Sequence, residues 1–435
     1  MPLNSYLSGM KKIALTLLVL ICSILLFAQK QMTEDSYLLQ KLAIETKENL
    51  TTNILPFWSE RMFDTSGGFY GRMDGNDQLD IDAQRGGILN ARILWTFSSA
   101  YRILGDSAWL SMATHARNYI IQHFIDRRHG GTFRSVDAAG NPVDKLKQTY
   151  SQAFFIYALT EYYRVTGDEE SLGEAKKIFA LIEHYCYDKQ NNGYFEAFDQ
   201  EWKRVNDQLI GEKSEQDTKG MNTHLHLMEA YTNLYRVWPD KMVAARLRNL
   251  IRLFLERLID PQTRHLVVFT NDQWEKTSDI NSYGHDIEAS WLLDEAATVL
   301  GDTELKNKVE EISLHVLQAA CEGLQPDGSL IYEKDIVTGH SDTDRHWWPQ
   351  AEAIVGFTNA WKLTGDKGYL LKAKRCWEYT NRTLVDHQHG EWYYSVSEQG
   401  VPNRQSDKAG FWKCPYHNGR MCLELIERVA QLSAH

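Results

Sequence analysis

The stretch Gly67-Gly68-Phe69-Tyr70 is the first of six similar segments in this chain of 435 residues. Each segment is rich in glycine and aromatic residues, continues through a polar or basic stretch, and leads into a helix that opens on unusual side chains. The other five begin at Gly130-Gly131-Thr132-Phe133, Gly193-Tyr194-Phe195, His265-Leu266-Val267-Val268-Phe269, Gly328-Ser329-Leu330-Ile331-Tyr332 and Gly390-Glu391-Trp392-Tyr393-Tyr394. Such a repeat indicates an architecture built from copies of one unit. The residues at equivalent positions of the copies are therefore the first candidates for a functional site.

The helix after each of the first five segments is followed by a short turn and a second helix. Glycine ends a helix readily in the left-handed conformation, and aspartate caps the first turn of the next one. The turns are Gly105-Asp106, Gly167-Asp168, Pro239-Asp240, Gly301-Asp302 and Gly365-Asp366. A helix over 33–54 is expected to be the partner of the last helix, which is predicted over 419–430.

These helix pairs predict an all-α fold in which six helical hairpins close into a toroid, with long loops and short β-hairpins at one end. An open helical solenoid is the alternative. Heavily decorated loops in every copy favour closure, because a closed ring brings all six loop–helix junctions to one mouth. No low-complexity linker interrupts the chain, so residues 31–435 are expected to form a single domain.

The first 30 residues have the features of an export signal. Lys11-Lys12 precede the apolar run 13–27, and Ala28 is a suitable residue before a cleavage point. The apolar run is shorter than the roughly 20 residues that a transmembrane helix needs. We therefore expect a signal peptide over 1–30 and an exported protein, periplasmic or secreted. An uncleaved signal anchor is the alternative, and no other membrane partner is expected.

The composition narrows the functional class further. The net charge is −11 and no basic stripe is visible, which argues against a nucleic-acid partner. The six cysteines are widely spaced and form neither a disulfide framework nor a CxxC zinc pattern. Aromatic residues make up 11% of the chain, which suits a protein that stacks against sugar rings, although core packing accounts for most of them.

Three histidines occur at equivalent loop–helix junctions. Asn222, His226 and Glu229 share one helix face, whereas His224 points elsewhere. Two histidines that diverge in this way do not make a metal site, so no metal is predicted. His285 opens another helix, and the third, His417, occupies the same kind of junction. One such histidine alone would more often be a cap or a core residue, but three equivalent ones favour a shared function.

Glu288 lies three residues after His285, on a helix expected to begin around Asp286. A carboxylate beside an imidazole fixes its tautomer and tunes its basicity. The positive end of the helix dipole favours the neutral imidazole, which is the form that a general base needs. The sequence therefore predicts that Glu288 supports His285 as a base.

Arg92 lies among apolar residues on a helix face that should be buried. A buried arginine is costly unless it has a partner or faces a cavity, so Arg92 is a candidate to stabilise a developing oxyanion. Arg85 could instead be a solvated loop residue. The segment from Arg345 to Glu352 adds two adjacent indoles and a carboxylate, and one indole could stack on a sugar. The second copy, 147–152, has no evident catalytic group and is expected to line the pocket.

At these residues the chain resembles the N-acylglucosamine 2-epimerase superfamily, and within it the cellobiose 2-epimerases. The resemblance covers essentially everything after about residue 35, and its motifs are specific in combination rather than singly. They are Asn90-Ala91-Arg92-Ile93-Leu94-Trp95, Asn222-Thr223-His224-Leu225-His226, Gly284-His285-Asp286-Ile287-Glu288, Trp347-Trp348-Pro349-Gln350-Ala351-Glu352 and Pro415-Tyr416-His417-Asn418-Gly419-Arg420.

The resemblance implies an (α/α)6 barrel and reversible epimerisation at C2 of the reducing-end sugar of β-1,4-linked disaccharides, without a cofactor. It implies that His285 and His417 are the acid/base pair, that His226 assists, and that Arg92 holds substrate oxygens. Glu288 supports His285. The substrate-binding residues that it implies are Asn222, Trp348, Trp412, Glu352 and Tyr150, with the two tryptophans as sugar platforms. Many relatives are cytoplasmic, and export would make mannobiose a rival to cellobiose, with lactose as a further substrate.

In this chemistry the sugar opens, one histidine removes the C2 proton, and a second histidine reprotonates the enediolate from the opposite face. An aldose–ketose isomerase on the same fold is the first alternative. An (α/α)6 glycosidase or lyase is less favoured, because it needs two carboxylates across the scissile bond, for which Asp286, Glu288 and Asp407 are candidates. A non-catalytic sugar-binding protein is the remaining alternative.

Overall fold

The computed structural model describes residues 34–205 and 217–433. The signal peptide expected over 1–30 lies outside the described residues and stays a prediction. In the part of the chain that is described, no helix combines the length and the apolar character needed to cross a membrane.

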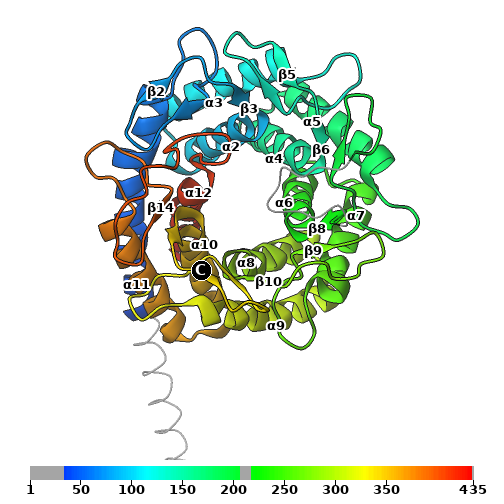
Figure 1. Ribbon diagram of the computed structural model, residues 1–435. Helices are drawn as coiled ribbons and strands as arrows, with labels where there is room; N and C mark the ends of the chain where they lie inside the picture. Colours follow the sequence, from blue (N-terminus) through cyan, green and yellow to red (C-terminus); the bar gives the residue numbers. More distant parts are fainter. Residues whose placement is uncertain (1–33, 206–216, 434–435) are drawn as a thin grey trace, which may run out of the picture.

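Six inner helices form a closed ring around a central axis (Figure 1). Each packs against the next, and the last one packs against the first, which distinguishes a closed barrel from an open solenoid. The prediction of an (α/α)6 barrel is confirmed. The inner helices are α2 (Gly87–Leu104), α4 (Thr149–Thr166), α6 (Met221–Val237), α8 (Tyr283–Leu300), α10 (Trp347–Thr364) and α12 (Tyr416–Ser433).

Each of the first five inner helices is followed by an outer helix that packs against it. Four of the connecting turns place a glycine at a positive φ, and an aspartate side chain caps each of the five outer helices. The helix over 34–49, followed by a π-helical turn at Leu50–Ile54 that contacts α12, completes the sixth pair. The outer helices are α3 (Ser107–Tyr119), α5 (Glu169–Leu181), α7 (Lys241–Leu253), α9 (Thr303–Ala320) and α11 (Lys367–Thr383).

Short π-helical or 3₁₀ turns end several of the outer helices. They are η2 (Phe57–Arg61), η3 (Ile120–Phe124), η4 (Ile182–Cys186), η5 (Phe254–Leu258) and the 3₁₀ turn η6 (Cys321–Gly323). Each turn delivers the chain to a Gly- and aromatic-rich segment at the start of a long loop. The sequence segments noted above are therefore the loops at one end of the barrel.

The loops carry short antiparallel strands that join neighbouring copies. The strand before each of the first five inner helices pairs with a strand of the following copy: β3–β4, β6–β7, β8–β9, β10–β11 and β13–β14. A bridge between Met73 and Ala409 joins the last copy to the first. The strands are β1 (Arg72–Met73), β2 (Leu79–Asp80), β3 (Arg85–Gly86), β4 (Ser135–Val136), β5 (Pro142–Asp144), β6 (Lys147–Gln148), β7 (Ala197–Phe198), β8 (Lys219–Gly220), β9 (Phe269–Thr270), β10 (Ile280–Ser282), β11 (Glu333–Asp335), β12 (Ser341–Asp342), β13 (Arg345–His346) and β14 (Ser395–Val396).

The fourth residue of several inner helices ties the helix to its hairpin. The Nε2 atom of His224 accepts a hydrogen bond from the Tyr194 amide at 3.0 Å, and Asp286 accepts one from the Leu266 amide at 2.8 Å. Gln152 and Gln350 receive equivalent bonds in their copies. These side chains satisfy backbone groups that would otherwise be buried without partners. His224 and Asp286 are thereby turned away from the barrel axis and toward the loops.

The basic residue just before several inner helices holds a loop aspartate. Lys147 bonds Asp126 at 2.8 Å, and Lys219 bonds Asp188 at 2.8 Å. Arg85 bonds Asp64 in the first copy and is buried, so the interpretation of Arg85 as a solvated loop residue is wrong. The basic stretches of the repeat are therefore structural anchors of the loops.

Replacing Lys219 by methionine is expected to destabilise the fold by about 3–5 kcal/mol, because Asp188 would remain buried without its cation. The Lys219 side chain is 0% exposed and also donates to the carbonyls of Asn192 and Asp272. Chemical denaturation measures the change. Lys203→Met is the control, because its ion pair lies on the surface and should change stability by less than about 1 kcal/mol. Equal stability losses in the two variants would contradict the anchor interpretation.

Candidate active site

A pocket lies where the inner helices begin, and every inner helix contributes to its wall. The pocket holds about 760 Å³ of free space, a volume that includes the open solvent at its mouth. Its lining residues are Arg92, Tyr150, Asn222, His226, His285, Glu288, Tyr332, Trp347, Trp348, Tyr394, Trp412 and His417. Nine of the ten site residues proposed from sequence line this pocket, and the tenth, Glu352, lies directly behind His417.

His285 and His417 both lie against the indole of Trp348. The ring centroids of His285 and Trp348 are 4.7 Å apart, and those of His417 and Trp348 are 5.5 Å apart. The two imidazoles come from α8 and α12. Burial lowers the pKa of His285 to about 3, and burial together with Arg92 and Arg420 lowers the pKa of His417 well below its usual range. Both rings are therefore neutral at physiological pH and able to accept a proton.

The partner of His285 differs from the prediction. Its Nδ1 atom lies 2.7 Å from the hydroxyl of Ser282, and not beside Glu288. Glu288 instead accepts a hydrogen bond from Arg420 at 2.7 Å. The interpretation of Glu288 as the support of His285 is wrong, because residues three apart on a helix can turn to different neighbours when another helix offers a stronger charged partner.

The other two histidines do have carboxylate partners. The Nδ1 atom of His417 lies 2.7 Å from Oε1 of Glu352, and the Nδ1 atom of His226 lies 2.8 Å from Oε2 of Glu229. A carboxylate on Nδ1 fixes the tautomer and leaves Nε2 for the substrate. Glu352, predicted to bind substrate, thus acts on the structure of the site through His417.

Arg420 organises these carboxylates and was not identified from sequence. It is 1% exposed, and its guanidinium bonds Glu229, Glu288 and Glu352. It lies three residues after His417 on the same face of α12. That spacing from a junction histidine was the signal available in the sequence. The guanidinium compensates the negative charge that three buried carboxylates bring to one place.

The surroundings of Arg92 differ from those of Arg420. Its Nη2 atom donates to the hydroxyl of Tyr150 at 2.8 Å, and the guanidinium lies over the rings of Phe154 and Tyr416 at 4.2 and 4.7 Å. No carboxylate among the described residues pairs with it. A buried cation that faces a pocket without a resident counter-ion is suited to hold a negatively charged oxygen of a bound molecule.

The sequence of this chain is similar to those of known proteins. Residues 68–419 match the family described as N-acylglucosamine 2-epimerase (GlcNAc 2-epimerase). The chain belongs to this family. The cellobiose 2-epimerase of Bacteroides fragilis is 50% identical over 383 residues, which cover 88% of this chain and 98% of that protein. The cellobiose 2-epimerase of Ruminococcus albus is 42% identical over 385 residues, covering 88% and 98%.

The comparison of structures agrees with the comparison of sequences. The structure of the cellobiose 2-epimerase from Bacillus thermoamylovorans superposes with a TM-score of 0.86 at 43% identity, covering 89% of this chain and 100% of that one. The resemblance inferred from the junction motifs is thus confirmed. This member of the N-acylglucosamine 2-epimerase family shares its barrel with relatives that are named for sugar epimerisation.

Three pocket residues of this family member were missed by the sequence argument. Tyr332 and Tyr394 come from the loops of the fifth and sixth copies, and Trp347 was quoted only as the neighbour of Trp348. The ring of Tyr332 lies 5.4 Å from that of Trp348 and extends the aromatic wall toward the mouth. Aromatic residues recur in the loop segments of all six copies, so nothing in the repeat marks these two.

The carboxylates considered for hydrolysis are not arranged for it. Asp286 bonds His265 at 2.6 Å, away from the pocket. Asp407 bonds Arg72 at 2.9 Å in a part-exposed pair. Of the three candidates only Glu288 lines the pocket. A pair of carboxylates across a scissile bond is therefore not assembled from these residues.

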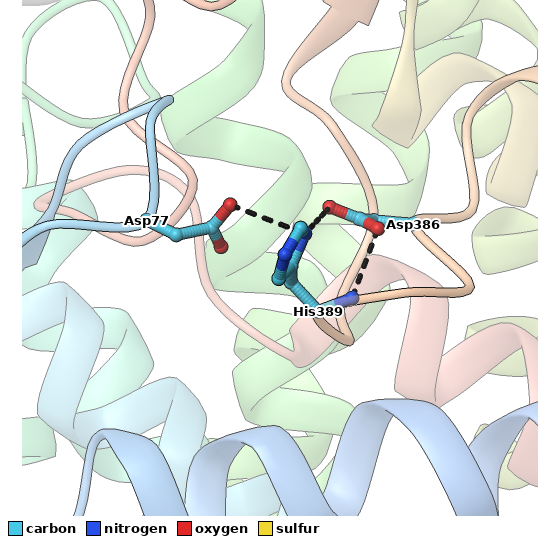
Figure 2. A group of neighbouring side chains, drawn as sticks. All are labelled: Asp77, Asp386 and His389. Atoms are coloured by element: carbon cyan, nitrogen blue, oxygen red, sulfur yellow. Dashed lines mark hydrogen bonds and ion pairs between the residues drawn. The ribbon is translucent and has the colours of Figure 1, made fainter.

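Two groups of side chains have the composition of metal ligands. One is Glu288, Glu352 and His417, where Arg420 already bonds both carboxylates. Figure 2 shows the other, in which His389 lies between Asp77 and Asp386. There the buried ammonium of Lys408 bonds Asp77 at 2.7 Å and Asp386 at 2.5 Å. In both groups a resident side-chain cation already bonds the carboxylates, which is the arrangement of an ion-pair network.

Proposed function

We propose that this protein epimerises the reducing-end sugar of β-1,4-linked disaccharides at C2, with cellobiose and mannobiose as the first substrates to test. The observation that carries the proposal is the pair of imidazoles, His285 and His417, which both lie against the indole of Trp348 in one pocket. A reaction that removes a proton from one face of a carbon and returns one to the other face needs one group that accepts a proton and a second that donates one. The names of the relatives support the same reaction.

The residues have distinct functions in the proposed mechanism. The opened sugar presents a C1 aldehyde, which acidifies the C2 proton. One histidine takes this proton, and the electron pair forms an enediolate whose negative oxygen is held by Arg92. The other histidine, which takes up a proton from solvent once the sugar is bound, delivers it to the opposite face of C2, and the first histidine releases its proton to solvent. His226, fixed by Glu229, assists at the adjacent oxygens.

The rest of the pocket binds the sugar rings. Trp348 and Trp412 present indoles, on which the apolar face of a pyranose can stack. Tyr150 holds Arg92 in place. The Oδ1 atom of Asn222 is buried and has no partner among the described residues, so it is available to a substrate hydroxyl. The pocket thereby combines aromatic platforms with a few convergent polar groups, as carbohydrate sites do.

Incubation with cellobiose, mannobiose and lactose in deuterium oxide, followed by NMR, tests the reaction class. The expected product is the C2 epimer with deuterium at C2. A ketose as the main product would assign the site to aldose–ketose isomerisation, because that reaction returns the proton to C1. Release of monosaccharides would assign it to hydrolysis. The relative rates on the three sugars rank the substrates.

The pH dependence of kcat/KM is expected to have an unusually low acid limb. An imidazole must be neutral to accept the C2 proton, and a lowered pKa keeps it neutral at lower pH. The pKa values of His285 and His417 both lie below the ordinary 6.5. Activity should therefore persist below pH 6.5 and fall only in more acidic solution. Circular dichroism across the same range separates titration from unfolding, and a limb at 6.5 or above would contradict the assignment of these bases.

We propose further that the protein acts outside the cytoplasm. The support is the Lys11-Lys12 pair followed by the apolar run 13–27. Cell fractionation with an antibody to the C-terminus is the test. The protein is expected in the periplasm or medium, in a form shorter by about the length of the signal. Recovery of the full-length chain in the cytoplasm would contradict the proposal.

A further inference from the structure

The three carboxylates around Arg420 receive unequal numbers of hydrogen bonds. Glu229 accepts from His226, Tyr416 and Arg420. Glu352 accepts from His417, Trp291 and Arg420. Glu288 accepts from Arg420 alone among the described residues. Because hydrogen bonds from donors stabilise the ionised form of a carboxyl group, Glu288 is the member least stabilised as an anion.

The charges of the cluster do not balance. Three carboxyl groups, each nearly or fully buried, share one guanidinium. A single nitrogen, Nη2 of Arg420, lies 2.7 Å from Oε1 of Glu288 and 2.7 Å from Oε1 of Glu352. Two carboxylates that meet at one donor repel each other, and a proton on one of them relieves the repulsion.

We propose that Glu288 is the protonated member of this cluster and donates a hydrogen bond to the substrate oxygen that becomes negative in the enediolate. The inference rests on the proposed epimerase function. Glu288 is the member that lines the pocket, whereas Glu229 and Glu352 lie behind histidines. An ionised carboxylate can only accept, and it would repel the enediolate. A neutral carboxyl group donates, and its proton stays on Glu288 throughout the step.

The electrostatic surroundings agree with this assignment. Burial and the neighbouring Glu352 raise the pKa of Glu288, and burial also raises that of Glu352. Burial opposes the ionisation of Glu229, but Arg420 and His226 outweigh it and lower the pKa of Glu229 to about 2. The charged and titratable groups that face Glu288 are Arg92 of α2, Tyr150 of α4, His226 and Glu229 of α6, Glu352 of α10, and Tyr416, His417 and Arg420 of α12.

The proposed donor complements Arg92. Arg92 approaches the pocket from α2 and Glu288 from α8, so the enediolate is met by a cation and by a neutral acid from different helices. A carboxylic acid kept neutral in a buried site is an effective partner for an enolate-like intermediate. Its hydrogen bond strengthens as negative charge develops on the oxygen, which is the condition for lowering the barrier.

The test compares Glu288→Gln with Glu288→Ala. Glutamine is neutral, nearly isosteric and a donor: its amide oxygen can face Arg420 while its NH₂ group faces the pocket. Glu288→Gln is expected to keep kcat within about tenfold of the wild type, whereas Glu288→Ala should lose roughly 10²–10³-fold, as for removal of one oxyanion donor. Equal losses in the two variants would overturn the proposal, because they would mean that the ionised carboxylate is what the reaction needs.

Infrared difference spectroscopy of the free enzyme tests the proton without any turnover. A carboxylic-acid C=O band at neutral pH should be present in the wild type and absent in Glu288→Gln. A band that persists in Glu288→Gln and disappears in Glu352→Gln would place the proton on Glu352 and overturn the assignment. If the band behaves as expected but no disaccharide is epimerised, the proposed function fails and the protonation of Glu288 stands.

The matched control is Glu161→Gln. Glu161 is a buried carboxylate at the other end of the barrel and bonds Arg102 at 2.7 Å. Burial acts to raise the pKa of Glu161, but Arg102 and Arg164 outweigh this effect and lower the pKa. The substitution is chemically the same as at Glu288. It should leave kcat, the fall of activity at high pH and the infrared band unchanged. In the wild type, deprotonation of Glu288 should lower the activity at high pH. If this fall disappears in Glu288→Gln alone, it arises from loss of the Glu288 proton.

Discussion

His285→Ala and His417→Ala are each expected to lower the epimerisation rate by roughly 10²–10⁴-fold or more, because each removes a group that moves a proton at C2. Sugar binding should survive, since Trp348 and Trp412 remain. Isothermal titration with the disaccharide and a coupled assay of the C2 epimer measure the two effects separately. Retention of epimerisation by either variant would refute the two-base mechanism.

The single variants also reveal which histidine acts on which epimer. With one base removed, the other can still exchange the C2 proton of one epimer with solvent, without inversion. In deuterium oxide each variant should therefore label only one of the two epimers at C2, and the two variants should label opposite ones. His389→Ala is the control, because His389 lies in the Asp77–Asp386 network outside the pocket and should label both (Figure 2).

Arg420→Met is expected to reduce both stability and activity strongly. Removing the shared partner of buried ion pairs costs about 3–5 kcal/mol, and here three carboxylates lose the same cation. The effect on catalysis can be recognised from the pH dependence of kcat/KM. Burial, Arg92 and Arg420 together lower the pKa of His417, so the loss of Arg420 lets this pKa rise and moves the acid limb of kcat/KM to higher pH.

Two further variants separate these effects. Arg420→Lys keeps the charge but loses the forked geometry, so it should lower kcat while leaving the acid limb near its wild-type position. Arg102→Met removes a comparable ion pair with Glu161 and Glu427 at the far end of the barrel. It should lower stability without moving the limb. An unchanged limb in Arg420→Met would show that Arg420 acts on folding alone.

The barrel could be predicted because its signals are local. A glycine at a positive φ, an aspartate that caps the next helix and apolar spacing along each helix depend on residues close in sequence. The aspartate cap recurs in five copies and the glycine in four of them. Which face of its own helix a residue occupies also depends only on its position relative to residues close in sequence. The spacing therefore correctly separated His226, which lines the pocket, from His224, which bonds the Tyr194 amide.

Partners across helices were less predictable. The sequence places Glu288 near His285, and the structure turns it to Arg420, 132 residues away. The same holds for Glu352, which meets His417 from a distance of 65 residues. Side chains three or four apart have several choices, and the choice is made by the strongest charged partner that the packing of neighbouring helices supplies.

The sequence by itself determined the repeat, the helix pairs and the residues that point toward the axis, because these follow from turn chemistry and helical periodicity. Only the tertiary structure decided that the ring closes, through the contact of α12 with α2. It also decided which carboxylates meet at Arg420, and therefore where a proton has to reside. Charge balance in a buried site depends on the distances between atoms from different helices, and those distances exist only once the ring has formed.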